Sequence, residues 1–120
     1  MPYIDGFVIP VPTSRREDYR AHEAKWWPYF KKSGATSLVV AWGDEVPAGK
    51  HTDFLRAVDA TEDETVVFAW MTWPNKETRQ TAYAKMLADM DPADMADMPF
   101  DGRRLIHGGF TPILVEGTTL

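Results

Sequence analysis

The chain has 120 residues, 44% of them hydrophobic and 12% aromatic, which predicts one folded globular domain over 1–120 and excludes a largely disordered protein. The absence of cysteine excludes disulfides, thiolate catalysis and cysteine-ligated metal centres. The formal net charge is −5 and no basic stripe offsets it, so we expect no binding to nucleic acid. No apolar run approaches the roughly 20 residues that span a bilayer, so we expect a cytoplasmic protein that does not bind a membrane.

The first predicted element is a strand over 3–10, whose alternation places four side chains on one side: Tyr3, Asp5, Phe7 and Ile9. A helix is expected from Ser14, because Ser-Arg-Arg-Glu at 14–17 has the capping-box pattern. Gly34 ends this helix. Its inward face is predicted from side chains at helical spacing: Tyr19, Glu23, Trp26, Trp27 and Phe30. An interior Pro28 removes one helical hydrogen bond, so the last turn should kink or split off.

Two further strands are expected over 36–44 and 65–73, with a shorter extended piece over 53–59 that forms a hairpin with the second of them. Asn75 is placed to cap a second helix, and a last strand follows around 104–110. The order strand, helix, strand, strand, helix, strand is the split βαβ pattern. It predicts an α+β protein with a ferredoxin-like βαββαβ antiparallel sheet.

Both faces of the middle strands are apolar. In the strand over 65–73, Phe68 and Trp70 share one face, and Val67 and Met71 share the other. In an antiparallel sheet with one solvent-exposed face, apolar and polar residues should alternate along each strand. Two helices cover only one face of a four-stranded sheet. A second copy of the sheet, packed face to face about a two-fold axis, would cover the remaining face. We therefore predict a homodimer with the helices outside and a core or cavity shared between the sheets.

Four stretches of the chain resemble the YbaA-like bacterial family: YIDGFVIPVP, GATSLVVAWGDEVPAGKHTDFLRAV, VVFAWMTWPNKETR and MPFDGRRLIHGGF. Together they cover most of the chain. This is a domain-of-unknown-function family in the dimeric α/β-barrel superfamily, so the resemblance implies a ferredoxin-like dimer and supplies no reaction. Relatives by fold include cofactor-independent monooxygenases, muconolactone isomerases and heme-degrading enzymes, a link by analogy, because fold does not fix function.

Two titratable residues are candidates for catalysis. Asp5 interrupts an apolar strand and so must face solvent, a polar partner or a cavity, where it would act as a general base. His107 lies in the last strand, which borders the first in this topology, and could form an acid–base pair with Asp5. The alternatives are that Asp5 pairs with a neighbouring arginine or a turn amide, and that His107 is a packed residue with satisfied nitrogens.

The loop after the second strand gathers residues of metal-ligand type: Asp44, Glu45, His51 and Asp53. Their spacing matches neither a calcium loop nor a helical zinc site, so we predict no metal. We expect instead a turn whose carboxylates cap local amides, in a loop that clasps another subunit or covers a cavity mouth.

Two other segments invite a functional interpretation. The methionines at 86, 90, 95 and 98 would suit copper(I), but packing is their commoner use, and a lid over the cavity is the better functional prediction. Removal of Met1 would expose Pro2 as an N-terminal base, as in tautomerases, although those enzymes are built from βαβ units and lack the adjacent middle strands expected here.

The leading hypothesis is a cytoplasmic homodimer that binds a small apolar or aromatic molecule in a dimer cavity, without a cofactor. If it is an enzyme, we expect cofactor-free proton transfer or oxygenation, with Asp5 and His107 as catalytic residues. The ligand-binding side chains would be Tyr3, Phe7, Trp42, Phe68 and Trp70. The rival is a noncatalytic structural or interaction homodimer in which these aromatic side chains fill the core.

Overall fold

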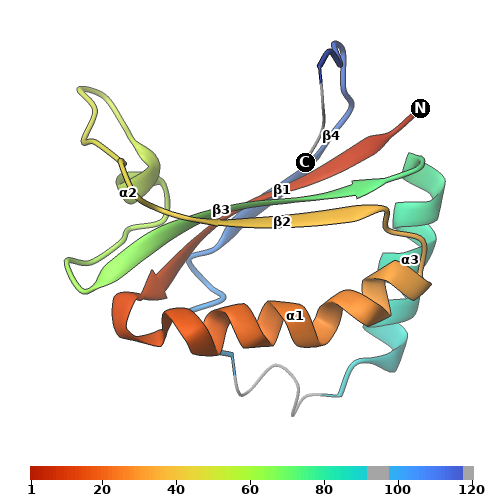
Figure 1. Ribbon diagram of the computed structural model, residues 1–120, viewed down its shortest axis with the longest axis horizontal. Coiled ribbons are helices and arrows are strands. Elements are labelled where there is room, and N and C mark those ends of the chain that lie inside the picture. Colours follow the sequence, from red (N-terminus) through yellow and green to blue (C-terminus); the bar gives the residue numbers. More distant parts are fainter. Residues whose placement is uncertain (92–97, 118–120) are drawn as a thin grey trace.

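Four strands form one antiparallel sheet in the computed structural model, which describes residues 1–91 and 98–117. They are β1 (Tyr3–Pro12), β2 (Ser37–Trp42), β3 (Glu64–Trp73) and β4 (Ile106–Phe110). Helix α1 (Arg16–Lys32) follows β1, and helix α3 (Lys76–Asp89) follows β3. The predicted α+β fold with βαββαβ order is therefore confirmed (Figure 1).

The sheet order is β2-β3-β1-β4, which places β1 and β3 in the centre and β2 and β4 at the two edges. Figure 1 shows α1 and α3 on the same side of the sheet, as the split βαβ pattern predicts. We call this side the helix face and the opposite side the open face. The short helix α2 (Phe54–Ala57) with its loop and the chain after β4 project beyond the open face in this view.

The two long helices differ in how they begin. Asn75 caps α3 as predicted, because its side-chain oxygen accepts a hydrogen bond from the Thr78 amide at 2.7 Å. The capping box predicted at Ser14 is wrong, since that residue lies in a 3-10 turn and α1 starts after Arg15 without a side-chain cap. The reason is tertiary: the Thr13 amide donates to the Asp63 carbonyl at 2.9 Å, which ties this turn to the start of β3.

The extended piece predicted over 53–59, with its hairpin, is also wrong. Asp53 instead caps α2, because its carboxylate accepts from the Arg56 amide at 2.7 Å and starts a single helical turn. Pro28 does not split α1, which continues through it to Lys32. Pro28 and Ala24, the residue whose carbonyl loses its donor, are both exposed, so water can take the missing place.

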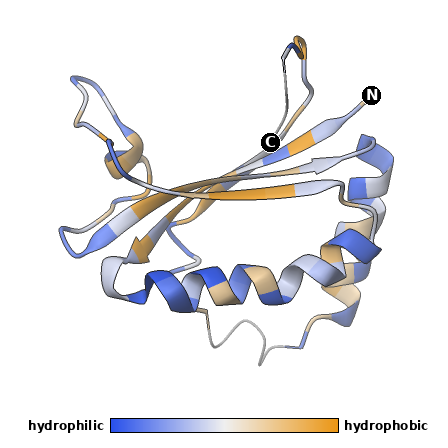
Figure 2. Ribbon diagram, in the orientation of Figure 1, coloured by the Kyte–Doolittle hydropathy of each residue, from blue (hydrophilic) through white to orange (hydrophobic). Residues whose placement is uncertain are grey.

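The hydrophobic core lies between the helix face and the two helices. One cluster of buried residues joins β1, β3 and α1: Ile9, Val11, Tyr19, Val67 and Ala69. A second joins β3 to α3 and the chain before β2: Ala35, Met71, Trp73 and Ala82. Figure 2 shows the hydrophobic colour running along the strands. None of the helices in the described ranges is long and apolar enough to cross a membrane.

Candidate functional site

Asp5 is the most buried polar residue of the sheet, with 1% of its surface exposed. Its carboxylate accepts hydrogen bonds from the Trp73 indole and the Tyr83 hydroxyl, each at 2.8 Å. Arg79 donates to the other oxygen through Nη2 at 2.9 Å and Nε at 3.1 Å. Both carboxylate oxygens are thus occupied, and the alternative that Asp5 pairs with an arginine is confirmed.

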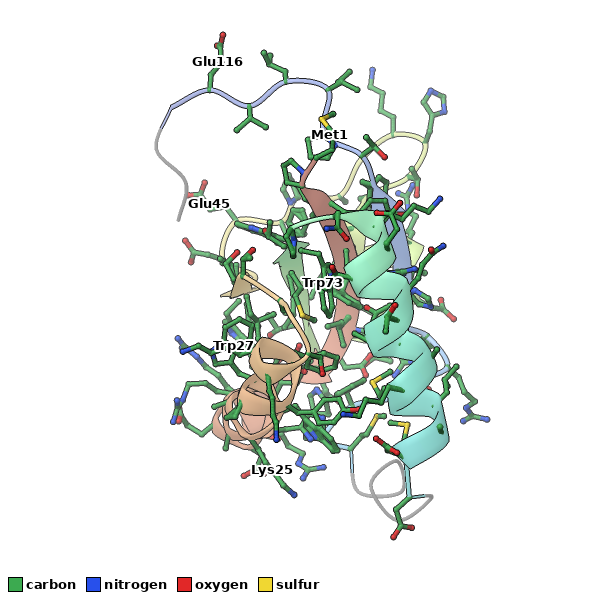
Figure 3. The ribbon with its side chains drawn as sticks, turned by 90° about the vertical axis from the view of Figure 1, so that its right-hand side faces the viewer. Met1, Lys25, Trp27, Glu45, Trp73 and Glu116 are labelled. Atoms are coloured by element: carbon green, nitrogen blue, oxygen red, sulfur yellow. The ribbon has the colours of Figure 1, made fainter. Side chains whose placement is uncertain are left out.

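The local sequence explains why this cluster forms. Arg79 and Tyr83 are four residues apart on α3, so their side chains lie on one face of the helix. The Arg79 guanidinium is 4.2 Å from the centre of the Tyr83 ring and 5.7 Å from that of Tyr3. Burial, reinforced by the Asp5 carboxylate, raises the pKa of Tyr83, which keeps its hydroxyl a donor. Figure 3 shows Trp73 in the layer between the strands and α3.

His107 lies apart from this cluster. The register of β1 and β4 pairs His107 with Phe7, whereas Asp5 lies opposite Gly109. The ring centres of His107 and Phe7 are 6.3 Å apart. None of the hydrogen bonds of Asp5 in the described residues comes from His107, so the structure does not bring the two predicted catalytic residues together.

A cavity of about 500 Å³ lies between the helix face and the two long helices, and we call it the helix-side cavity. The sheet contributes Phe7, Ile9, Leu38, Ala69, Met71 and His107. The helices contribute His22, Glu23, Trp26, Phe30, Tyr83, Met86 and Leu87, and the chain after α3 contributes Met90, Met98, Phe100 and Leu105. Most of this lining is aliphatic or aromatic, which is the usual character of a site for a small organic molecule.

The polar part of the cavity wall comes chiefly from α1. Burial raises the pKa of Glu23, so its carboxyl is more readily protonated than one in water. Tyr19, one helical turn earlier, is 1% exposed, and Glu23 is the polar side chain with which its buried hydroxyl interacts. Burial, with the Glu23 carboxylate adding to it, raises the pKa of Tyr19. The sequence contains one signal for this pair: Glu23 is the only acid in an otherwise aromatic helix stripe.

A second space, of about 590 Å³, lies on the other flank of α1, between that helix and edge strand β2. We call it the outer groove. Trp42 lines it, with the Arg16 guanidinium 5.6 Å from its ring centre. Trp27 lies on the sheet side of α1, whereas Lys25 points away from the sheet (Figure 3). Glu23 lines both the outer groove and the helix-side cavity, so it lies in the wall between them.

The open face carries a third, shallow hollow of about 590 Å³, with an almost entirely apolar lining. Phe68 and Trp70 belong to it, and Phe68 is 45% exposed. Phe7 and His107 border this hollow as well as the helix-side cavity. The predicted ligand-binding residues therefore do not converge on one site: Trp42 lines the outer groove, Phe68 and Trp70 lie on the open face, and Tyr3 packs beside Arg79.

The loop before α2 is held by its own polar groups. The Asp53 carboxylate accepts from the Gly49 amide at 3.0 Å, and Arg56 donates to the Gly49 carbonyl at 2.9 Å. Hydrogen bonds from the backbone amides, that of Arg56 foremost, lower the pKa of Asp53. The capping role predicted for the loop carboxylates is confirmed for Asp53. In the described ranges, no group of three or more His, Cys, Asp or Glu side chains is arranged to hold a metal ion.

The methionine segment is described only in part. Met86, Met90 and Met98 line the helix-side cavity, whereas Met95 and the rest of 92–97 lie outside the described residues. The predicted lid therefore stays a prediction.

The chain is similar in sequence to one protein family and in fold to a solved structure. The sequence pattern of the protein family of unknown function DUF1428 matches residues 2–102. The uncharacterized protein YbaA of Escherichia coli strain K12 and that of Shigella flexneri are each 47% identical over 117 residues, which cover 97% of this chain and all of theirs. The solved structure of SnoaB, a cofactor-independent oxygenase from Streptomyces nogalater, matches with a TM-score of 0.54 over 95% of each chain, at 11% identity. The likeness to SnoaB is one of fold.

Proposed function

Because the chain belongs to the DUF1428 family of proteins of unknown function, we propose a function from the cavities of its own fold. The protein binds a small apolar or aromatic molecule in the helix-side cavity, as one half of a homodimer. The observation that carries this proposal is the cavity itself: about 500 Å³, walled by aliphatic and aromatic side chains, with a few polar groups on α1 and β4. Sites for small organic molecules have this size and this lining.

The open face supports the homodimer. Its exposed apolar side chains come from β3, β4 and α2: Phe54, Phe68, Ile106 and Phe110, with exposures between 44% and 60%. A continuous apolar surface of this kind is typical of a protein interface, and a second copy matches it by symmetry. In this arrangement Phe68 and Trp70 contact the partner sheet, while Phe7 and His107 contact the ligand.

The proposed chemistry, where there is one, is cofactor-free proton transfer or oxygenation. SnoaB, which is described as a cofactor-independent oxygenase, shares the fold. His107 is the candidate base, because it lines the cavity and histidine is the most common proton-transfer group in enzyme sites. For Asp5 we now propose a positioning role: its ion pair with Arg79 holds α3, and hence the cavity wall, against the sheet.

Native mass spectrometry with a pair of matched variants tests the proposal. Leu87 is 73% exposed and lines the cavity, so Leu87→Trp should occupy its mouth without disturbing the core. Ala88 is exposed on the same helix and is not a lining residue, so Ala88→Trp is the control. We expect a dimer that retains a small-molecule adduct in the wild type and in Ala88→Trp, and that loses it in Leu87→Trp.

Two results would count against this function. A monomer at micromolar concentration contradicts the homodimer. A ligand that binds only the folded state must stabilise it. The ligand site is therefore contradicted if the wild-type protein carries no adduct and its melting temperature does not rise when apolar aromatic compounds are added. That result favours the noncatalytic homodimer with a filled core.

A further inference from the structure

The chain after β4 exposes apolar side chains that the fold of a single copy does not use. Residues 111–117, which we call the arm, follow Phe110 and include Ile113, Leu114 and Val115, which are 98%, 75% and 63% exposed. Single apolar residues are common on a surface, but three in succession on a projecting segment form a patch. No backbone hydrogen bond between described residues ties the arm to the rest of the chain.

The arm leaves the sheet on the side of the proposed dimer contact. Figure 1 shows it beyond the open face, and Figure 3 places Glu116 at the opposite end of the molecule from Lys25 of α1. Pro112 has no amide hydrogen, which favours the end of the strand at this point. Sheets packed face to face lie roughly 10 Å apart, and an extended backbone advances about 3.3 Å per residue, so 111–115 can reach the level of a second sheet.

Helix α2 is the second projection on the open face, and it carries Phe54, which is 49% exposed. It follows β2, whereas the arm follows β4, the opposite edge strand. The register places the end of β2, Trp42, in line with Ile9 of β1. The end of β4, Phe110, lies opposite Ile4, near the other end of β1. The arm and α2 therefore stand at diagonally opposite corners of the sheet.

Symmetry can bring these two projections together. A two-fold axis that lies between facing sheets and crosses the line joining the two corners carries the arm of each copy to α2 of the other. Each copy then gives one arm and receives one, so the contact closes within a dimer. A membrane surface suits the arm less well, because the formal net charge of the chain is −5 and the charged residue of the arm is the acidic Glu116.

We propose that the arm crosses to a second copy of this chain, where Ile113–Val115 pack against α2 and the exposed ring of Phe54. This inference rests on the proposed homodimer and names a contact that holds its two copies together beyond the facing sheets. The aliphatic run of the arm is then buried from water in the dimer. The dimer depends on residues outside the sheet as well as on the open face.

A photocrosslinking residue in the arm tests the contact directly. The full chain with p-benzoylphenylalanine in place of Leu114 should form a covalent dimer on a denaturing gel after irradiation. Trypsin cleaves after Lys50 and Arg56, so the mass of the linked peptides should show attachment to residues 51–56, which include Phe54. The control carries the same photocrosslinking residue in place of Leu87, which is 73% exposed on the helix side, and should form no covalent dimer.

Sedimentation equilibrium measures what the arm contributes. Replacing Ile113, Leu114 and Val115 together by serine should raise the dissociation constant of the dimer at least about a hundredfold, because three aliphatic side chains of each copy lose their burial. Leu87→Ser, which removes an exposed apolar side chain from the helix side, should leave that constant unchanged. If the triple serine variant does not fold, the crosslinking experiment decides the question alone.

The outcomes separate this inference from the function on which it rests. An unchanged dissociation constant in the triple serine variant, or a covalent link to any segment other than 51–56 of the second copy, overturns the inference and leaves the homodimer in place. Binding to phosphatidylglycerol vesicles that the triple serine variant loses would assign the arm to a membrane and also overturn it. A wild type that is monomeric at micromolar concentration overturns the proposed homodimer, and the inference with it.

Discussion

Asp5 combines a charge with near-complete burial, which is tolerable only because Arg79 lies against it. Removing one partner of a buried ion pair leaves the other charge uncompensated in a medium of low polarity. Asp5→Asn should therefore lower the free energy of unfolding by about 3–5 kcal/mol. Urea denaturation measures the change.

The control is Asp18→Asn, which breaks an ion pair between side chains that are 65% and 45% exposed. Its effect should stay below about 1 kcal/mol, because water screens exposed pairs. Equal effects of the two substitutions would contradict a structural role for the Asp5 cluster.

Glu23 should make stability depend on pH in one particular window. Its pKa in the folded protein is raised above the ordinary 4.5 by burial, so the folded state keeps a proton that the unfolded chain has lost. The free energy of unfolding should therefore decrease as the pH rises from 4.5 through the raised value. Glu23→Gln should remove this decrease of the free energy of unfolding with pH. The control Glu17→Gln, at an exposed residue of the same helix, should leave the decrease in place. A slope that survives Glu23→Gln would assign the effect to another group.

At the scale of secondary-structure elements, one arginine docks the last strand onto the sheet. Arg104 lies two residues before β4, and its two terminal nitrogens bind the Glu64 carboxylate at the start of β3 at 2.6 and 2.7 Å. It also donates to Asp101 at 3.0 Å and to the Asp59 carbonyl at 2.9 Å. The hydrogen bonds from Arg104 are the main reason that the pKa of Glu64 falls to about 2. The stability that the pair of Arg104 and Glu64 contributes is fully present above pH 4.5. It is lost as the pH falls from there through about 2, where Glu64 takes up a proton in the folded protein.

Loss of the two-pronged contact should loosen β4. A lysine keeps the charge but cannot bind two carboxylate oxygens in the same plane. In Arg104→Lys we expect the amides of Ile106–Phe110 to exchange with solvent several-fold faster in hydrogen-exchange measurements. Arg103→Lys is the control, because the side chain of Arg103 is 93% exposed. Unchanged exchange in both variants would mean that the β1 ladder alone holds β4.

The elements also show how far the sequence carries a prediction. Alternation in β1 and β3 predicts the strands, and Asn75 marks the start of α3, because these signals are local. Helix α2 is a single turn without periodicity, and it depends on Asp53 reaching both Gly49 and Arg56 across the loop. The capping box failed for a similar reason, since contacts to β3 determine the turn before α1.

The sequence predicts which kinds of residue form the candidate site, but not which of them lie together in the fold. Alternation alone does not say which face of one strand shares a side with which face of another, so Phe7 was grouped with Phe68. The register places Phe7 opposite Ala69 in β3, and therefore away from Phe68. Asp5 was identified as a buried polar residue, but its partners Arg79 and Tyr83 lie more than seventy residues away in sequence. Glu23 was predicted on the inward face of its helix, but its position between two spaces becomes visible only in the structure.

At the scale of the whole molecule, the open face determines how copies should associate. Phe68→Glu places a charge on this face, at a residue that is 45% exposed in the single chain. We expect sedimentation equilibrium to show a dimer for the wild type and a monomer for Phe68→Glu. Leu87→Glu, which alters an exposed apolar residue on the helix side, should remain dimeric. A dimeric Phe68→Glu would move the interface elsewhere.

The strand order has one more consequence, for the kind of assembly the protein can build. The unpaired backbone edges belong to β2 and β4, which span only Ser37–Trp42 and Ile106–Phe110, and Pro112 follows β4 closely. Short edges and a nearby proline discourage strand-to-strand growth, the route by which sheets propagate into fibres. Contact through a face about a two-fold axis consumes that face in both copies and then stops. In the proposed homodimer, the same topology would therefore favour a finite, self-limiting complex over open-ended polymerisation.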